Sequence, residues 1–159
     1  MTIMKIDLSI AITTALFSAI WVILATTLNI PAWAGFLGCT TYFAINQHSR
    51  KAFLICALSL ISGSFWACMS LELTQFCSGS LFVLFIATGL IAFFMCIQAR
   101  LIILSFIPAA FIGSCTVFAG ANQLTSSLEA LFIGLLTGYL MKSSGYKLHE
   151  LTESEKQKP

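Results

Sequence analysis

The residues that could perform chemistry in this chain are few and scattered. Its 159 residues include six cysteines, two histidines and six acidic residues. Catalysis would need a nucleophile beside a base or two carboxylates in one cleft, and a metal site would need several ligands close together. No two cysteines have CxxC spacing, and His48 and His149 lie far apart in the sequence. We therefore expect no enzyme activity, no catalytic residue, and no metal or cofactor site.

Simpler roles suit these residues. We expect both histidines to be solvated, one in a loop and one in the polar tail. Five of the six cysteines lie inside apolar runs, where a thiol behaves as a small buried hydrophobic group. Cys77 lies near the end of a run and is the cysteine that we would test for oxidation.

The composition identifies lipid as the solvent of this chain. Hydrophobic residues make up 58% and charged residues 9% of the sequence, whereas about a quarter of the residues in soluble domains are charged. A water-soluble fold of this length could not bury so much apolar surface. The net charge of +2 comes from scattered residues, which cannot track a phosphate backbone. We expect the lipid bilayer as a partner and no nucleic acid.

Six apolar segments are long enough, or nearly so, to cross a bilayer. A helix needs about 20 apolar residues to span about 30 Å of hydrocarbon. The short connections between the segments require neighbouring helices to pack antiparallel. The sequence predicts an all-α membrane protein with six transmembrane helices in one domain, residues 1–145, and a polar cytoplasmic tail, residues 146–159, that frays. The segments are approximately Leu8–Leu28, Pro31–Asn46, Ala52–Leu71, Cys77–Ile97, Leu101–Gly120 and Ser127–Met141.

The basic residues orient these segments. All eight fall at alternate ends of the six segments, and the other ends carry only Glu72 and Glu129 as charges. Basic residues resist translocation and so collect in cytoplasmic loops. We expect a multi-pass protein with both termini in the cytoplasm. The basic residues are Lys5, Arg50, Lys51, Arg100, Lys142, Lys147, Lys156 and Lys158.

Two segments allow another interpretation. A secretory signal would begin with a basic residue such as Lys5, but Leu8–Leu28 is longer than the apolar core of about 7–15 residues that such signals have, so we favour a spanning helix. Pro31–Asn46 is short and contains two glycines, and it could enter and leave on one side as a re-entrant hairpin. That would place Arg50 on the side opposite Lys5, so we favour a short or tilted crossing.

The two halves of the chain share a pattern. Phe36–Ala44 and Phe111–Ala119 both read F-[LI]-G-x-x-T-x-F-A, at an offset of 75 residues. The same offset pairs Leu60–Gly63 with Leu135–Gly138. A single match in so apolar a chain could be chance, but two in one register indicate a duplicated three-helix unit. Because three is odd, the second copy must enter the membrane upside down, which predicts two inverted repeats, residues 8–71 and 77–141.

The second helix of each half is interrupted by glycine and proline. Paired interruptions of this kind point to a solute site near the membrane midplane. The hydroxyls of two threonines would lie there, and two phenylalanines would form a constriction. An alternative is that the glycines only allow close packing and the threonines bond their own helix. The predicted solute path comprises Gly38, Thr41, Phe43, Gly113, Thr116 and Phe118.

The absence of ionisable residues from the middle of every predicted span limits the function. Proton relays and ion pumps keep such groups inside the membrane despite their cost. We therefore expect a channel or facilitator for a small neutral or weakly charged solute. The competing hypothesis is a non-transporting assembly or regulatory protein. Small-residue faces such as Gly134 and Gly138 also predict a homo-oligomer.

The three tryptophans are expected to anchor the helices at the membrane surface. Trp33 lies at a predicted boundary, and Trp21 and Trp66 lie in the outer halves of their spans. Tryptophan rings are enriched at the level of the lipid headgroups. A vestibule lined by these rings is the alternative.

Several stretches resemble one known family. They are Trp33-Ala34-Gly35-Phe36-Leu37-Gly38-Cys39-Thr40, Met95-Cys96-Ile97-Gln98-Ala99, Leu104-Ser105-Phe106 and Phe111-Ile112-Gly113. Together they resemble the YcdZ-like family of bacterial inner-membrane proteins, and the likeness runs from about residue 8 to about residue 145. The resemblance implies a location in the bacterial cytoplasmic membrane and a shared six-helix plan. The family has no assigned activity, so the resemblance carries over no functional residue.

Overall fold

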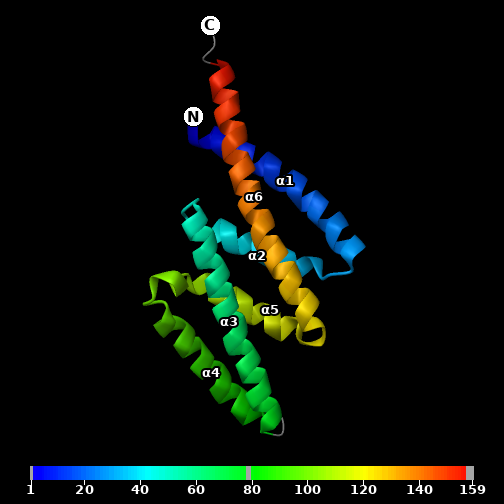
Figure 1. Cartoon of the computed structure of the whole chain (residues 1–159), viewed down its shortest axis with the longest axis vertical. Coiled ribbons are helices and arrows are strands. Elements are labelled where there is room, and N and C mark those ends of the chain that lie inside the picture. The colour runs from blue at the N-terminus through cyan, green and yellow to red at the C-terminus, as the bar shows by residue number, and fades with distance from the viewer. Residues whose placement is uncertain (1, 78–79, 157–159) are drawn as a thin grey trace.

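The computed structural model describes residues 2–77 and 80–156, and the side chains of residues 8–77 and 80–154. Residues 78–79 and 157–159, which include Lys158, lie outside the described residues. The described part is helical throughout, and both termini lie at the same end of the long axis (Figure 1). The helices are α1 (Thr2–Leu28), α2 (Ala32–Ala44), α3 (Arg50–Phe76), α4 (Leu81–Gln98), α5 (Ile107–Ala119) and α6 (Leu124–Lys156), with 3₁₀ turns η1 (Ile102–Leu104) and η2 (Ala121–Gln123).

Local sequence sets the helix boundaries. Asn29, which follows α1, has a φ of 54°, the left-handed conformation that ends many helices. Pro31 precedes α2 in an extended conformation. The Ser49 side chain accepts a hydrogen bond from the Ala52 backbone amide at 3.0 Å and so caps the start of α3. Pro108 lies in the first turn of α5, where its missing amide proton is not needed.

Four helices, α1, α3, α4 and α6, are long and apolar enough to cross a membrane. The helices α2 and α5 have 13 residues each, or about 20 Å of length against about 30 Å of hydrocarbon. The predicted span Leu101–Gly120 was too long, because η1 and the turn at Ser105 and Phe106 precede the start of α5. The helix α2 contains no reversal, which favours a single passage over the re-entrant hairpin. Six crossings stay a prediction.

The last helix is longer than its sequence suggested. We expected the apolar segment to end at Met141 and the polar end to fray, but α6 continues to Lys156. The segment after Met141 contains no proline before residue 159 and is rich in leucine, lysine and glutamate, which favour helix. Its single glycine, Gly145, packs against Ile10 of α1. Hydropathy therefore marked where the helix stops being apolar, and the helix itself goes on.

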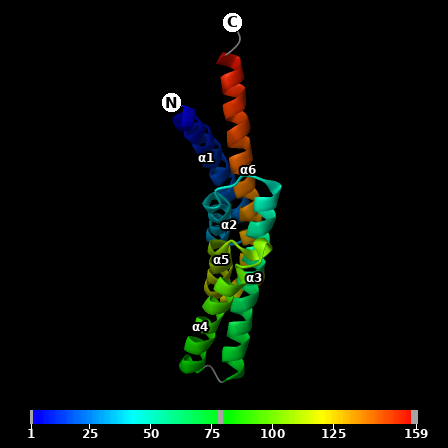
Figure 2. The same cartoon turned by 90° about the vertical axis from the view of Figure 1, so that its left-hand side faces the viewer.

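The short helices pack across the halves of the sequence. The helix α2 lies along α6, and α5 lies along α3. The helices α1 and α4 cover the same two long helices, α6 and α3 respectively. In the middle of the molecule α2 and α5 contact each other and run in opposite directions (Figure 1). Seen from the side, the helices form a narrow array (Figure 2).

Glycines set the closeness of these contacts. A Cβ added at Gly38 would clash with the backbone of Leu131 on α6, and one at Gly113 would clash with the carbonyl of Leu60 on α3. Small residues let membrane helices approach until their backbones touch. Gly134 and Gly138 meet α2 in the same way, so these two residues serve packing within the protomer. The core between α2, α3, α5 and α6 contains Tyr42, Cys56, Leu60, Ala109, Leu131 and Leu135.

The prediction for Trp21 as a surface anchor was wrong. Its side chain is 1% exposed and lies against Gly35, where any Cβ would collide with the indole ring. Its Nε1 donates to the Ala32 carbonyl at 3.0 Å, so the polar end of the ring is satisfied inside the protein. Trp33 is 40% exposed. The half-buried Trp66 donates to Gln98 Oε1 at 3.0 Å.

Candidate functional site

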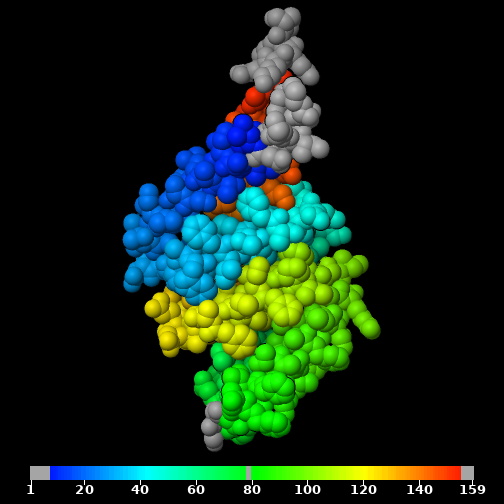
Figure 3. Space-filling model, turned by 180° about the vertical axis from the view of Figure 1, so that it is seen from behind, coloured from blue at the N-terminus to red at the C-terminus, as the bar shows by residue number. Residues whose placement is uncertain are grey.

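The structure brings the predicted path residues into the central layer without placing them around an opening. Gly38 and Gly113 are buried at the α2–α6 and α5–α3 contacts. Phe43 is half-buried, and Phe118 faces outward with 37% of its surface exposed. On the face seen in Figure 3, the cyan surface of α2 meets the yellow surface of α5 directly. The six residues lie outside the cavities that we describe for the side chains of residues 8–77 and 80–154.

The two threonines of the predicted path use their hydroxyls within their own helices. Thr41 Oγ1 donates to the Leu37 carbonyl, and Thr116 Oγ1 donates to the Ile112 carbonyl, both at 2.9 Å. Both threonines are fully buried. This is the bonding that the packing interpretation required. In this conformation neither hydroxyl proton is directed at a solute.

Polar hollows lie elsewhere, at the turn that joins α5 to α6. We call this region the α5–α6 corner: residues 119–129 with the facing α1–α2 turn at residues 29–33. It contains two neighbouring cavities of about 200 and 510 Å³, which share Asn122 and Gln123. The smaller cavity is lined by Pro31, Trp33, Ala119, Gly120, Asn122, Gln123 and Ser127, and the larger by Asn29, Asn122, Gln123, Leu124, Thr125, Ser126 and Glu129.

Ser127 gives this corner its chemical character. Its side chain is 1% exposed, lines the smaller cavity and has no hydrogen-bond partner for its Oγ among the described residues. A buried hydroxyl without a partner costs about 1–3 kcal/mol. A Cβ at Gly120 would collide with this hydroxyl, so the glycine keeps the space beside it free. The two cavities also offer three side-chain amides and the Glu129 carboxylate, and neither cavity lining contains a lysine or arginine.

The opposite turn, between α2 and α3, contains a filled polar cluster. We call it the α2–α3 corner: residues 42–53 with the facing segment 139–146 of α6. His48 lies between two hydroxyls, with Tyr42 Oη 2.9 Å from Nδ1 and Ser143 Oγ 3.2 Å from Nε2. Lys142 Nζ donates to the carbonyl of Ile45, the residue that follows α2, at 3.0 Å. Lys142 is buried, and its ammonium lies 5.5 Å from the centre of the Tyr42 ring.

Aromatic rings close the α2–α3 corner. His48 stacks on Tyr139 with ring centroids 5.5 Å apart and lies 5.1 Å from the Tyr146 ring. This burial, and secondly the neighbouring Lys142, lower the pKa of the His48 imidazole below its usual 6.5. The expectation of a solvated loop histidine was therefore wrong. His48 is half-buried, and His149 is buried at 8% exposure, with Nε2 3.8 Å from Glu153 Oε2.

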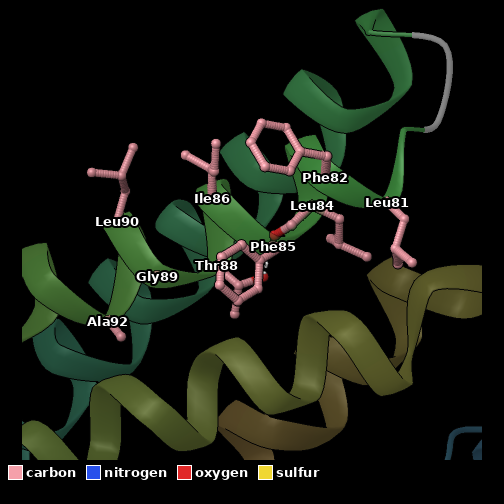
Figure 4. Close-up of a pocket in the computed structure, with 9 residues that line it drawn as sticks. All are labelled: Leu81, Phe82, Leu84, Phe85, Ile86, Thr88, Gly89, Leu90 and Ala92. Carbon is pink, nitrogen blue, oxygen red and sulfur yellow. Dashed lines mark hydrogen bonds between the residues drawn. The ribbon is translucent and has the colours of Figure 1, made fainter.

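A further apolar surface lies along α4. The nine residues that border a hollow of about 1200 Å³ all belong to this one helix (Figure 4). Leu81 is 79% and Phe85 76% exposed, and the only polar side chain among the nine, Thr88, donates to the Leu84 carbonyl within the helix. This face resembles a lipid-contacting helix surface and lacks the convergent polar groups of a solute site.

The cysteines divide between the core and the surface. Cys39 and Cys56 are buried, and Cys39 Sγ donates to the Gly134 carbonyl at 3.1 Å. Cys96 and Cys115 are exposed, so the expectation of burial was wrong for these two. Cys77 is half-buried, and its oxidation stays a prediction. Among the described side chains no group of three or more metal-ligating residues comes together.

Sequence reasoning missed both corners for the same reason. It treated the segment from Ala121 to Ser126 as a polar break and His48 as a loop residue. The clue to the first corner was the cluster of Asn, Gln, Thr and Ser just before an apolar helix. No local signal marks Lys142 as a partner of Ile45, because the two are 97 positions apart.

The chain is similar to proteins that have been grouped before. Residues 11–146 match the model of a family described as a protein of unknown function, DUF1097. The inner membrane protein YcdZ of Salmonella typhimurium is 46% identical over 142 residues, which cover 89% of each chain. The inner membrane protein YcdZ of Escherichia coli is 45% identical over 142 residues, 89% of this chain and 87% of that protein. No solved structure matches this chain.

Proposed function

This chain belongs to the DUF1097 family of inner-membrane proteins, and from that premise we propose that it is a facilitator for a small, uncharged, hydrogen-bonding solute. The observation that carries the proposal is the hollow at the α5–α6 corner. There the buried hydroxyl of Ser127, which has no partner among the described side chains and backbone, lines a cavity bordered by two amides. A polar ligand in that cavity would supply the missing hydrogen bond.

The charges around the hollow favour a neutral solute. Glu129 is the single ionisable residue in the two linings. A carboxylate without a neighbouring cation repels anions. The smaller cavity, about 200 Å³, has room for a molecule of only a few heavy atoms. Small amides and short polyols fit these limits.

An inverted repeat would explain how such a solute passes. Exchanging α1 with α4, α2 with α5 and α3 with α6 turns the α2–α6 contact into the α5–α3 contact and the α1–α6 contact into the α4–α3 contact. In Figure 1 a half-turn about the viewing direction carries α6 close to the place of α3. We propose two inverted three-helix repeats that move against each other at the glycine contacts of α2 and α5, with the predicted path residues between them. Alternating access in many transporters has this form.

The distribution of charge supports the proposed orientation. The α2–α3 corner, with Arg50 and Lys51, and the α4–α5 connection, with Arg100, lie toward one end of the helices. The C-terminal end of α3 and the α5–α6 connection lie toward the other (Figure 1). Under the positive-inside rule the first end is cytoplasmic. The α5–α6 corner would then face the periplasm.

The second candidate is a membrane protein that transports nothing. The specific observation in its favour is the close-packed centre, where Gly38 and Gly113 touch backbone and both path threonines bond their own helices. An assembly or regulatory protein needs only such packing.

Flux into proteoliposomes distinguishes the two candidates. We expect the purified protein to speed the entrance of at least one of urea, acetamide, glycerol and erythritol above the rate in protein-free vesicles. Ser127→Ala should reduce that rate severalfold. Ser59→Ala is the matched control, because Ser59 is also fully buried with an unpartnered hydroxyl but lies outside the corner. Protein-independent rates for the whole panel would reject the facilitator and leave the non-transporting protein.

We also propose that the protein forms homo-oligomers through the apolar face of α4. Gly134 and Gly138 are occupied within the protomer, whereas a Cβ at Gly89 of α4 would have no neighbour within 4 Å among the described residues. Mass photometry in mild detergent should give a multiple of 17.3 kDa. Gly89→Trp should shift the distribution toward monomer, and a wild-type protein that is monomeric in native lipid nanodiscs would contradict the proposal.

A further inference from the structure

A groove with one charged end lies between α3 and α6. It has a volume of about 450 Å³ and is lined by Arg50, Phe53, Leu54, Leu136 and Tyr139. It lies beside the α2–α3 corner, since Phe53 and Tyr139 also contact Tyr42 in that corner. The proposed function does not use this groove.

The walls of the groove suit a hydrocarbon chain. Leu54 is 58% and Leu136 49% exposed, so both present their side chains to the surroundings of the helices. The back of the groove is rigid, because the rings of Phe53 and Tyr139 meet edge to face at 5.5 Å. In a membrane-embedded helix pair, such a surface contacts lipid tails and cannot bind a small polar solute.

The end of the groove suits an anion. Arg50 is exposed and begins α3, and the exposed Lys51 follows it. Among the described side chains the single ion pair is that of His149 with Glu153, so the guanidinium of Arg50 is not neutralised by a described carboxylate. Guanidinium groups bind phosphate through two parallel hydrogen bonds. Basic residues beside the ends of membrane helices attract anionic lipid headgroups.

We propose that this groove binds one anionic phospholipid, with an acyl chain along Leu54 and Leu136 and the phosphodiester on Arg50. The apolar walls of the groove select for the acyl chain, and Arg50 selects for the phosphodiester. A free phosphate ester would leave the apolar walls empty, and a zwitterionic lipid would bring a cation close to Arg50 and Lys51. The inference depends on membrane insertion but not on solute flux, so its failure leaves the proposed function untouched.

Native mass spectrometry tests the lipid site directly. The full chain in mild detergent is mixed with phosphatidylglycerol or phosphatidylcholine of identical acyl chains, and bound lipid is counted. We expect the wild type to retain phosphatidylglycerol in preference, and Arg50→Gln to reduce that preference roughly fivefold, the effect of one basic residue near a lipid surface. Arg100→Gln is the matched control, because Arg100 is an exposed arginine in another loop and lines none of the described cavities. It should leave the preference unchanged.

Two further variants separate the parts of the site. Arg50→Lys keeps the charge and removes the two-pronged geometry, so an intermediate preference is expected. Leu136→Trp fills the groove and should lower the binding of both lipids, whereas Leu24→Trp on the exposed face of α1 should not. Equal retention of the two lipids by the wild type, or equal effects of Arg50→Gln and Arg100→Gln, would overturn the proposal. So would binding of free glycerol 3-phosphate as tight as that of the lipid.

Discussion

The α2–α3 corner and the α5–α6 corner are built at equivalent points of two similar helix pairs, yet one is filled and the other is hollow. At the first, Lys142 binds the carbonyl at the end of α2, and tyrosine rings surround His48. At the second, Gly120 ends α5 beside a cavity with an unpartnered hydroxyl. The backbone alone therefore does not decide whether such a corner is open.

The side chains of the long helices differ at the positions that the 75-residue offset pairs. At the 75-residue offset Lys142 corresponds to Ala67 and Tyr139 corresponds to Ser64, both small. His48 corresponds to Gln123, and Ala52 corresponds to Ser127. Large groups on α6 close the first corner, whereas no residue of α3 lines the described cavities of the second.

The largest expected effect comes from breaking the contact on which both corners depend. Gly38→Leu would push its side chain into the backbone of Leu131 on α6, and we expect a loss of about 3 kcal/mol of stability or more, or failure to fold. Gly113→Leu should act alike against Leu60 on α3. Thermal unfolding in detergent, followed by circular dichroism, measures the loss.

Ala15→Leu is the control for the glycine variants, because Ala15 is exposed on α1 and lies outside both the glycine contacts and the α4 face. It should change the stability by less than about 1 kcal/mol. Comparable losses for Gly38→Leu and Ala15→Leu would mean that the glycine contact does not hold the two halves.

The second largest effect is expected from removing the Lys142 ammonium from the filled α2–α3 corner. Lys142→Met keeps the length of the side chain but leaves the Ile45 carbonyl without its described donor, which should cost about 1–3 kcal/mol. Lys147→Met is the control, since Lys147 is exposed on the same helix and should be nearly neutral. If the two variants unfold at the same temperature, Lys142 does not stabilise the corner.

The hollow corner should respond in the opposite direction. Ser127→Ala removes a buried hydroxyl that has no described partner, so we expect unchanged or slightly higher stability, by up to about 1 kcal/mol. A clear loss of melting temperature would show that the hydroxyl is satisfied in the apo protein, and the contrast between the corners would be weaker. Paired with reduced solute flux, a gain in stability would mark Ser127 as a residue kept for binding.

The smallest effect concerns pH. Burial and Lys142 lower the pKa of His48 below 6.5, so the folded protein prefers the neutral imidazole and the unfolded chain binds the proton more tightly. Stability should therefore be full above pH 6.5 and decline as the pH falls from there toward the lowered pKa. His48→Gln, the residue at the equivalent position of the other corner, should reduce this decline between pH 6.5 and 5 in melting experiments. An unchanged pH profile in the variant would assign the decline to other groups.

Much of the helical plan was readable from the sequence, because hydrophobic length and polar breaks are local. The pattern shared by Phe36–Ala44 and Phe111–Ala119 selected the two helices that meet in the middle. The lengths of α2 and α5 were overestimated, since hydropathy does not distinguish a residue in a turn from one in a helix. Trp21 was misplaced because an amphipathic ring suits a lipid boundary and a satisfied core site equally well. The two corners depend on contacts between residues that are far apart in the sequence, so no short stretch of sequence contains both partners.

The continuity of α6 has a mechanical consequence. Its 33 residues make a rod of about 50 Å, which holds Gly134 against α2 and carries Glu150 and Glu153 beyond the filled corner. A stiff helix transmits a tilt along its whole length, so a small rotation about the Gly134 contact becomes a large displacement of the C-terminal end of α6. A protein that binds the C-terminal end of α6 would thereby tilt the part of α6 that packs against α2. A spin label at position 150 would report such a movement from outside the core.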